Sequence, residues 1–545
     1  MNQIAQQLCT RLDQLRSARS SYESHWSECY QYGAPERQQC FSSSSTTNNK
    51  TQERQRADLY DSTAADAVQI LVSMIMNGVT PSNAIWFKAQ PDGIDDLTVL
   101  TDGERWLEDV CQFMWRNIHA ANFDSESYET ITDIVTAGWG VLYTDIDREA
   151  GGGYVFESWH TGNCFIGSTR ADGIIDTIFR EHEMPAETMV KTYGEENCHE
   201  AVKRTLETNP DAKLKLLHVI QPRQSKGAGQ LNKDMPFASY HIDVSNKHCM
   251  KESGYHEFPC SVPRLRRLPN SVYGNGQMTL ALADAKTVNE LMKQTLHSAE
   301  LQIGGMWIAE DDGVLNPHTV RIGPRKVIVA NSIDSMKRLD DGTNFVIAEY
   351  LINNLQGSIR KKLMADQLPP IGTQQMTATE IHTRVELIRQ MLGPMYGRLQ
   401  SEYLKSILDR CFGLALRSGI LGQPPQELLG SNLSFKFVSP LARSQRMEEV
   451  MATEQYIESV GQMATIDKTI LDNVDFDAVA VLVGNGRGVP QSIMRTADEV
   501  KQLRDARERI AQEQQQAQQQ QEMLSKAGDV VAKGLEQQVT TGVMQ

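Results

Sequence analysis

The sequence has no long apolar run. None of its 545 residues lies in an uninterrupted stretch of eighteen or more apolar side chains, which is about the length that a membrane-spanning helix needs. The N-terminal residues 1–19 are polar and lack the apolar core and small-residue cleavage site of a signal peptide. We therefore expect no membrane partner, and a protein that is made and kept in a cytoplasm.

Paired cysteines and an excess of basic residues are also missing. The nine cysteines form no CxxC pair, and their odd number and irregular spacing argue against a disulfide framework, so we expect reduced thiols. The 54 Lys and Arg residues are outnumbered by 69 Asp and Glu residues, which gives a formal net charge of −15. Tight, sequence-independent binding of nucleic acid depends on basic side chains that neutralise phosphates. The composition therefore argues against a protein that grips DNA over a large surface.

Motifs for phosphate binding and catalysis are incomplete. The run Gly484–Gly488 resembles part of a phosphate-binding loop, but it lacks the Lys-Ser/Thr pair of a Walker motif and is predicted to be a flexible turn. Asp145, Asp147 and Glu149 could form a magnesium-binding carboxylate set. They lie on an expected hairpin and alternate toward solvent, so a solvated strand face is favoured. No Ser/His/Asp or Cys/His arrangement stands out in the sequence.

One segment gathers histidine and cysteine. Its members are His241, His248, Cys249, His256 and Cys260. The last two have a spacing that zinc could use, but no standard zinc motif forms and the segment is typical of strands and turns. We therefore predict no metal site, no cofactor and no catalytic residue.

The apolar pattern predicts a mainly helical chain with one α+β region. Helical periodicity marks four N-terminal segments, at 3–32, 59–77, 103–117 and 125–137. Trp86 and Phe87 begin a short extended piece. Between 138 and 268 the periodicity changes and β-forming residues dominate. Strands are expected at 140–146, 154–159, 175–181, 215–221, 237–244 and 262–268, the first two as a hairpin.

Two long helices with a small β unit between them are expected next. Residues 278–302 and 343–366 each carry one apolar stripe. The segment 306–330 is rich in turn-forming residues and predicts a compact β-like insert, so the three parts form a protrusion with a folded tip. Two such helices cannot bury both sides within one chain, and we expect neighbouring molecules to cover the rest.

A break and a long kinked helix follow this protrusion. Two consecutive prolines exclude helix from part of the segment 367–376. A very long helix is then expected over residues 377–417. Gly393 and Pro394 lie inside it and predict a kink, because proline lacks a backbone donor and clashes with the preceding turn.

The C-terminal part is predicted to be helical after a link. Residues 418–440 read as a loop-rich connection. Helices are expected at 441–467, at 475–483 and at 496–526. The glutamine run 512–521 is compatible with helix in an assembly and with disorder in a free chain.

Four pieces of sequence stand in a fixed order between about residues 10 and 430. They are Leu59-Tyr60-Asp61-Ser62-Thr63 with Gly78, Pro81 and Trp86-Phe87; Asp172-Gly173 and Ile175-Asp176-Thr177 with Arg180-Glu181; Tyr273-Gly274-Asn275-Gly276 with Ala283-Asp284 and Asn289; and Met376-Thr377-Ala378-Thr379-Glu380-Ile381 with Arg384, Glu386, Leu392-Gly393-Pro394, Tyr396, Arg398-Leu399 and Glu402. Together they resemble the head-to-tail connecting proteins, or portal proteins, of short-tailed phages. Residues after about 440 carry little of this resemblance.

The resemblance implies a non-enzymatic subunit of a ring, usually of twelve copies, at one vertex of a capsid. The fold class that it implies is mainly α with an α+β wing. The expected parts are the wing at 1–275, a first stem helix at 276–304, a small α/β clip at 305–340, a second stem helix at 341–366, a tunnel loop at 367–376, a kinked long wing helix and link at 377–440, a helical crown at 441–505, and a barrel or glutamine-rich tail at 506–545.

The resemblance also implies a channel for double-stranded DNA. Its tunnel loop would be Gln367, Leu368, Pro369, Pro370, Ile371, Gly372, Thr373, Gln374, Gln375 and Met376. Arg360, Lys361 and Lys362 would repeat around the ring as a basic band, unless they are a solvated face favoured by the helix C-terminus. The acidic surroundings would let DNA pass, because they repel phosphate and prevent capture.

The partners implied by the resemblance are the large terminase subunit, a tail adaptor, and the major capsid and scaffolding proteins. The location implied is the portal vertex of the virion, with assembly in the host cytoplasm. One alternative is another phage head or tail protein without a DNA channel, which a closed ring with a lumen of about 20 Å or more would exclude. The other is a metal-dependent nuclease or packaging ATPase, which assays of DNA cleavage and ATP turnover would detect.

Overall fold

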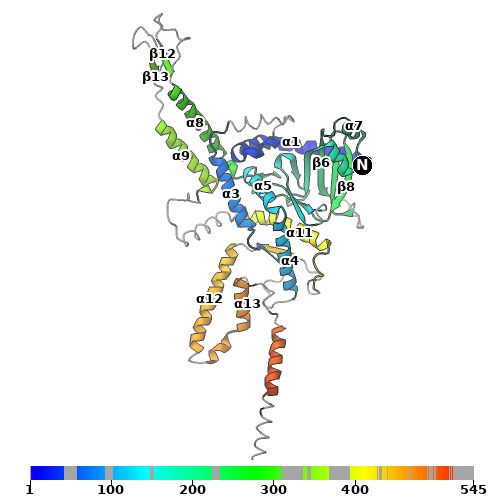
Figure 1. The fold of residues 1–545 in the computed structure, drawn as a ribbon, viewed down its shortest axis with the longest axis vertical. Helices are drawn as coiled ribbons and strands as arrows, with labels where there is room; N and C mark the ends of the chain where they lie inside the picture. The colour runs from blue at the N-terminus through cyan, green and yellow to red at the C-terminus, as the bar shows by residue number, and fades with distance from the viewer. Residues whose placement is uncertain are drawn as a thin grey trace, which may run out of the picture. The chain divides into compact units, whose positions relative to one another are not determined.

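In the computed structural model, the chain folds into two compact units (Figure 1). The first is Met1–Trp86 with Met114–Leu421, and the second is Phe87–Phe113 with Gly422–Gln545. The structure describes residues 2–41, 58–91, 102–147, 152–223, 234–269, 271–304, 306–309, 336–339, 345–367, 393, 395–425, 428, 433–437, 440–464, 468–487, 489, 495, 499–514, 516 and 518. Among these residues, no helix combines the length and apolar character that crossing a membrane requires.

The N-terminal helices lie close to where the apolar periodicity predicted them. They are α1 (Asn2–Gly33), α3 (Thr63–Val79), α4 (Asp102–Ala120), which contributes to both units, and α5 (Phe123–Thr136); the 3-10 turn η1 (Pro35–Phe41) follows α1. Helix α3 begins at Thr63 rather than near residue 59. The Asp61 carboxylate accepts hydrogen bonds from the Thr63 backbone nitrogen (3.2 Å) and hydroxyl (3.0 Å), which fixes the chain in a turn just before the helix.

A five-stranded antiparallel sheet is the centre of the first unit. Its order is β4 (Cys164–Gly167), β5 (Thr177–Pro185), β6 (Lys213–Pro222), β7 (Phe237–Asp243) and β8 (His248–Tyr255). Leu217 and Val219 of β6 pack in one core cluster with Leu8 and Leu12 of α1. Leu216 points to the opposite face, because side chains alternate along a strand.

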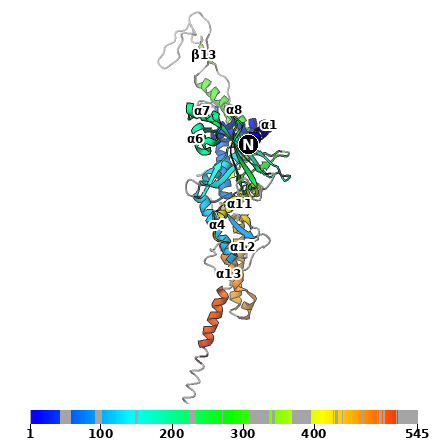
Figure 2. The same cartoon turned by 90° about the vertical axis from the view of Figure 1, so that its right-hand side faces the viewer.

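That opposite face carries two short helices that the sequence analysis did not predict. They are α6 (Ala186–Tyr193) and α7 (Glu200–Thr208), with the 3-10 turn η3 (Glu195–Asn197) between them, and Figure 2 shows the sheet between them and α1. Met189 of α6 and Val202 of α7 are buried with Leu216. Each helix buries one or two side chains only, so its apolar periodicity is too weak to read in the sequence.

A second, three-stranded sheet contains the predicted hairpin. Strands β2 (Leu142–Ile146) and β3 (Tyr154–Ser158) pair antiparallel, which confirms that prediction, and β9 (Cys260–Ser261) pairs with β2. The continuous strand expected at 262–268 is wrong. The chain there forms an isolated bridge between Arg264 and Trp139 and the short strand β10 (Arg266–Arg267), paired with β11 (Gly274–Asn275), because Pro263 has no backbone N–H to donate to a ladder.

Two long helices of the first unit lie side by side, as predicted (Figure 1). They are α8 (Met278–Gly304) and α9 (Phe345–Lys362). Strands β12 (Met306–Ala309) and β13 (Met336–Leu339) pair antiparallel between them in sequence, which confirms a β-containing insert. Helix α9 ends four residues before the predicted residue 366, and the 3-10 turn η6 (Ala365–Gln367) follows it.

The last helix of the first unit contains an irregular turn. Residues 395–399 are helical, η7 (Gln400–Leu404) is a π-helical turn, and α11 (Lys405–Arg417) continues to the predicted end. A π turn widens the helix locally, and the Ser261 hydroxyl donates to the Tyr403 carbonyl at 3.4 Å. Pro394, where the kink is predicted, lies outside the described residues.

The second unit has a short sheet and helices. Strand β1 (Phe87–Pro91) pairs antiparallel with β14 (Leu433–Phe437). The prediction of a loop-rich link over 418–440 is therefore wrong at β14, where Leu433, Phe435 and Phe437 alternate as in a strand. Helices α12 (Pro440–Ala464) and α13 (Phe476–Arg487), joined by η9 (Lys468–Asn473), confirm the predicted helices. The flexible turn predicted for Gly484–Gly488 is wrong over 484–487, because α13 continues through these residues. Residues 499–514 are helical as predicted, and residues 519–545 lie outside the described part.

Two histidines stack on each other on one face of the five-stranded sheet. The rings of His218 and His241, on neighbouring strands, stack with centroids 4.1 Å apart. His218 hydrogen-bonds Ser239 at 2.9 Å and His241 hydrogen-bonds Tyr193 at 3.0 Å. Burial holds the pKa of His218 well below its ordinary value and lowers the pKa of His241 to about 3.

These histidines predict a loss of stability in acid. Both stay neutral in the fold, whereas in the unfolded chain they take up protons below about pH 6.5. Stability is therefore expected to fall as the pH drops from about 6.5 toward 3. The urea midpoint measured at pH 7 and pH 4.5 should shift less in His241→Phe than in the original protein. An equal shift in both proteins would contradict this assignment.

Candidate functional site at the base of helices α8 and α9

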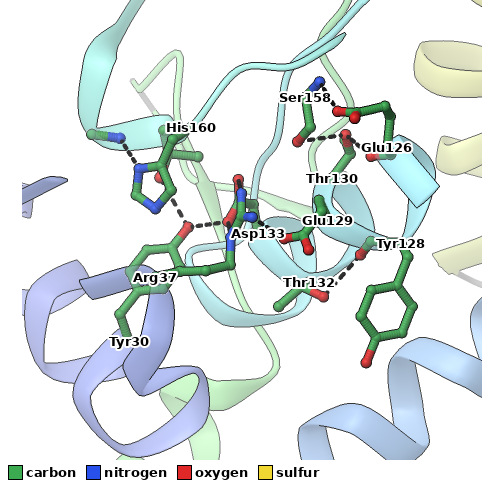
Figure 3. A network of polar contacts seen from close by, with 12 residues as sticks. Tyr30, Arg37, Glu126, Tyr128, Glu129, Thr130, Thr132, Asp133, Ser158 and His160 are labelled. Atoms are coloured by element: carbon green, nitrogen blue, oxygen red, sulfur yellow. Dashed lines mark hydrogen bonds and ion pairs between the residues drawn. The ribbon is translucent and has the colours of Figure 1, made fainter. Parts of the chain in front are cut away.

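A buried polar network fixes the frame on which the site is built (Figure 3). The Asp133 carboxylate on α5 is fully buried and accepts hydrogen bonds from the Tyr30 hydroxyl on α1 at 2.8 Å and from two nitrogens of Arg37 at 2.8 and 2.7 Å. Arg37 also forms an ion pair with Glu129. The carboxylate thus has several charge-assisted partners, which a buried charge requires.

A second set of contacts in the same view joins α5 to β3. Glu126 accepts a hydrogen bond from the Ser158 backbone nitrogen at 2.7 Å, and the Thr130 hydroxyl lies 3.1 Å from the Ser158 hydroxyl (Figure 3). Helix α5 is therefore held at one side by α1 and at the other by the small sheet. Its C-terminal end lies against the start of α8.

Glycine is required where α8 begins. A Cβ atom on Gly276 would lie 2.5 Å from the Thr136 carbonyl oxygen and 2.7 Å from that of Val135. Tyr273, just before it, packs with Trp26 and Trp139 at ring-centroid distances of 5.1 and 5.3 Å. At Tyr273–Gly276 the backbone therefore passes close to the end of α5, and the Tyr273 ring holds it there by packing against two tryptophans.

The piece 59–63 is tied to α8 by one buried amide. Asn289 accepts hydrogen bonds from the Tyr60 nitrogen at 2.7 Å and the Asp61 nitrogen at 3.2 Å, and it donates to the Asp58 carbonyl at 3.1 Å. Asp61 in turn accepts a hydrogen bond from Gln356 of α9 at 2.7 Å. The chain before α3 is thereby joined to both long helices.

The C-terminal turn of α9 is held by α8. Asp284 accepts hydrogen bonds from Lys362 at 2.6 Å and from Ser358 at 2.7 Å. Burial raises the pKa of Asp284, but the hydrogen bonds from Lys362 and Ser358 outweigh that effect and leave the pKa below its ordinary value. Gln277 donates to the Lys362 carbonyl at 2.7 Å and accepts from Arg266 at 2.9 Å.

A buried arginine connects two further pieces. Arg264 donates to Glu402 at 2.7 and 3.0 Å through two guanidinium nitrogens, and to the Gly173 carbonyl at 3.1 Å. The Tyr396 hydroxyl donates to the Gly78 carbonyl at 2.9 Å. Within the first unit, the helix that contains the π turn is therefore fixed to Arg264 by a bidentate ion pair.

The structure describes some of the predicted channel residues. Arg360 and Lys361 are exposed on the last turn of α9, whereas Lys362 is occupied by Asp284. Gln367 ends η6, and Leu368–Met376 lie outside the described residues. Gly393 is helical and exposed. The predicted band is thus divided into two open cations and one that contacts the protein.

The rejected metal candidates have other contacts. Asp145 accepts from the Tyr143 hydroxyl at 2.8 Å and forms an ion pair with the buried Arg410 at 3.3 Å, so it is not the simple solvated strand face that was expected. His241 stacks on His218. Over the described ranges, no group of three or more His, Cys, Asp or Glu side chains is arranged to hold a metal ion.

Several site residues were not predicted. Gln277, Gln356 and Ser358 belong to no recognisable motif. Arg264 was predicted only to lie in a strand. The sequence offers one signal for residues of this kind, which is a polar residue beside an apolar helical stripe, as Asn289 lies next to Val288. Their partners are far away in sequence, so their roles depend on the tertiary fold.

Comparison with known proteins decides the family. A model of the family described as bacteriophage head to tail connecting protein matches residues 5–494. The chain belongs to this family. It is 24% identical over 555 residues to the probable portal protein of Bordetella phage BPP-1, a match that covers 96% of this chain and 94% of that protein. It is also 24% identical over 531 residues to the portal protein of Salmonella phage epsilon15, covering 93% and 92% of the two chains.

The family likeness inferred from the four sequence pieces is confirmed, and the chain is a phage head-to-tail connector. A solved structure described as the neck of an empty GTA particle covers 74% of this chain and 90% of its own chain, at 12% identity and a TM-score of 0.34. A similarity at that TM-score supports no conclusion about the fold or the function of this chain. The two curated relatives are named portal proteins, and neither name describes an enzyme.

Proposed function

We propose that this head-to-tail connector assembles into a closed ring, of twelve copies, through which double-stranded DNA enters and leaves the capsid. The exposed apolar side chains of α8 and α9 carry this proposal. Four of them, between 43% and 88% exposed, are Leu296, Ile303, Tyr350 and Leu351. Apolar surface of this extent on a protruding helix pair is typical of an interface, and neighbouring copies around a ring would cover it.

The parts of the ring follow from this arrangement. Helices α8 and α9 form the stem, and the insert that contains β12 and β13 forms the clip, where the large terminase subunit docks. Helices α12 and α13 belong to the crown, and residues 506–545 extend it. The tail adaptor and the capsid and scaffolding proteins are further partners, at the portal vertex of the virion after assembly in the host cytoplasm.

The open cations of α9 support a channel surface. In a ring, Arg360 and Lys361 would recur in every copy while Lys362 stays with Asp284. Brief contacts of this band with phosphates are compatible with passage, because the chain as a whole is acidic.

Removing the open cations should weaken binding to DNA. In rings of Arg360→Gln/Lys361→Gln, the plot of log affinity for a short duplex against log salt concentration should become shallower, by about 1 for each phosphate that the ring no longer neutralises. Exchanging the exposed Arg204 and the half-buried Lys203 of α7 for Gln gives a control with the same change of charge. Equal slopes in both variants would contradict a basic band in the channel.

Residues 367–376 are proposed to act as a valve or grip on DNA. Deleting them should leave the ring intact and reduce DNA packaging or retention severalfold, as measured by the DNA content of purified heads. Heads that fill and keep DNA normally would overturn this role.

We further infer that the chain has no enzymatic activity of its own, so that an ATP-driven motor is a separate protein. The relatives' names are consistent with this inference. Purified protein should show neither metal-dependent DNA cleavage nor ATP turnover, and either activity would contradict it.

A further inference from the structure

The segment that leaves α9 is anchored by a distinct set of contacts. Leu363 is fully buried, and its backbone nitrogen donates to the Ile359 carbonyl at 3.0 Å. Met364 follows with a φ of +58°, in the left-handed region that side chains other than glycine rarely adopt. Such a backbone conformation persists only where surrounding contacts impose it.

Those contacts converge on Lys362. Its side chain is held by Asp284, a residue of α8 whose carboxylate is 19% exposed, and its carbonyl is held by Gln277, which is 3% exposed. The side chain of Lys362 is therefore fixed by α8, and its backbone by the residue just before α8. The neighbouring Arg360 and Lys361 are exposed on the same turn.

We propose that Lys362, Asp284 and Gln277 form a positioning anchor, which sets the turn 363–367 and so the point from which the chain continues toward the channel. Lys362 acts through Asp284 and is not a contact for DNA. This inference rests on the proposed channel, and it assigns to one residue of the basic band a role different from that of the other two.

The two roles make opposite predictions for Asp284. If Lys362 contacts phosphate, Asp284→Asn frees that cation and strengthens DNA binding, whereas Lys362→Met weakens it. If Lys362 is an anchor, the two variants have the same effect, because each breaks the same ion pair. The double variant then has no further effect, since either single change already removes the coupling.

Hydrogen exchange on assembled rings tests the anchor directly. In Asp284→Asn and Lys362→Met, amide exchange of the peptide 359–367 should be several-fold faster, and the double variant should match the single ones. Lys361→Met, a neighbouring exposed lysine, is the matched control and should exchange as the original protein does. Lys362→Arg should restore part of the protection.

The outcomes separate this inference from the ring itself. Rings that form normally, with unchanged exchange in Asp284→Asn or with additive effects in the double variant, overturn the anchor and leave the portal function standing. Absence of rings from the original protein overturns the portal function instead. If Asp284→Asn prevents assembly, Gln277→Leu removes the hydrogen bond to the Lys362 carbonyl while leaving the ion pair with Asp284 in place, and it should give the same faster exchange. Arg266→Gln, which disturbs the other hydrogen bond of Gln277, is its control. No change in Gln277→Leu also overturns the anchor.

Discussion

Replacing Arg37 by methionine is expected to lower the free energy of unfolding by about 3–5 kcal/mol, because it leaves a buried carboxylate without its cation. Asp133 is fully buried, and Arg37 supplies two of its three hydrogen bonds described above (Figure 3). The Tyr30 hydroxyl alone cannot replace that charge. Chemical denaturation, followed by the fluorescence of Trp26 and its neighbours in the same region, measures the loss.

The matched control is Arg16→Met on α1. Arg16 also bonds two carboxylates, those of Asp13 and Glu181, but its side chain is 46% exposed. Surface pairs of this kind contribute about 0–1 kcal/mol. A loss in Arg37→Met no larger than in Arg16→Met would show that the Asp133 network does not hold α1 and α5 together.

Placing a carboxylate on the exposed face of α9 should abolish the ring. Leu351 is 43% exposed in the single chain, so Leu351→Glu leaves the fold of the subunit almost unchanged. Once a neighbour covers that position, an unpaired charge is buried in every interface of the ring, which is costly each time. Light scattering at equal protein concentration should then show subunits or small oligomers in place of the ring.

A control with the same introduced charge separates assembly from folding. Arg204→Glu lies on α7, where the side chain is 81% exposed, and should assemble normally. Both variants should melt at the temperature of the original subunit within a few degrees. A Leu351→Glu protein that still forms rings would mean that this face of α9 is not an interface.

Local periodicity predicted the helices on which the proposed channel depends. The apolar stripes of α8 and α9 lie within single segments, and each helix is long enough for the 3.6-residue period to be unambiguous. The hairpin of β2 and β3 was also predicted, because its strands are adjacent in sequence and joined by glycines. The helices of the second unit were predicted for the same reason as α8 and α9.

Elements that depend on distant partners were not predictable in this way. Strand β14 pairs with β1, more than 300 residues earlier, and although its residues alternate as in a strand, five residues inside a loop-rich segment are too few to identify it without that partner. The role of Lys362 is a stronger case. A lysine at a helix C-terminus is favoured by the helix dipole in any protein, and only the position of Asp284 on another helix distinguishes an anchor from a DNA contact.

The mass and symmetry of the purified protein, by light scattering and electron-microscopic class averages, test the central claim most directly. The protein is to be examined alone and after coexpression with its capsid and scaffolding proteins. The account predicts a closed ring of about 733 kDa, twelve times the 61.1 kDa of one chain, with a central hole of about 20 Å or more, wide enough for duplex DNA. A protein that stays monomeric under both conditions, or an assembly without a central hole, would contradict it.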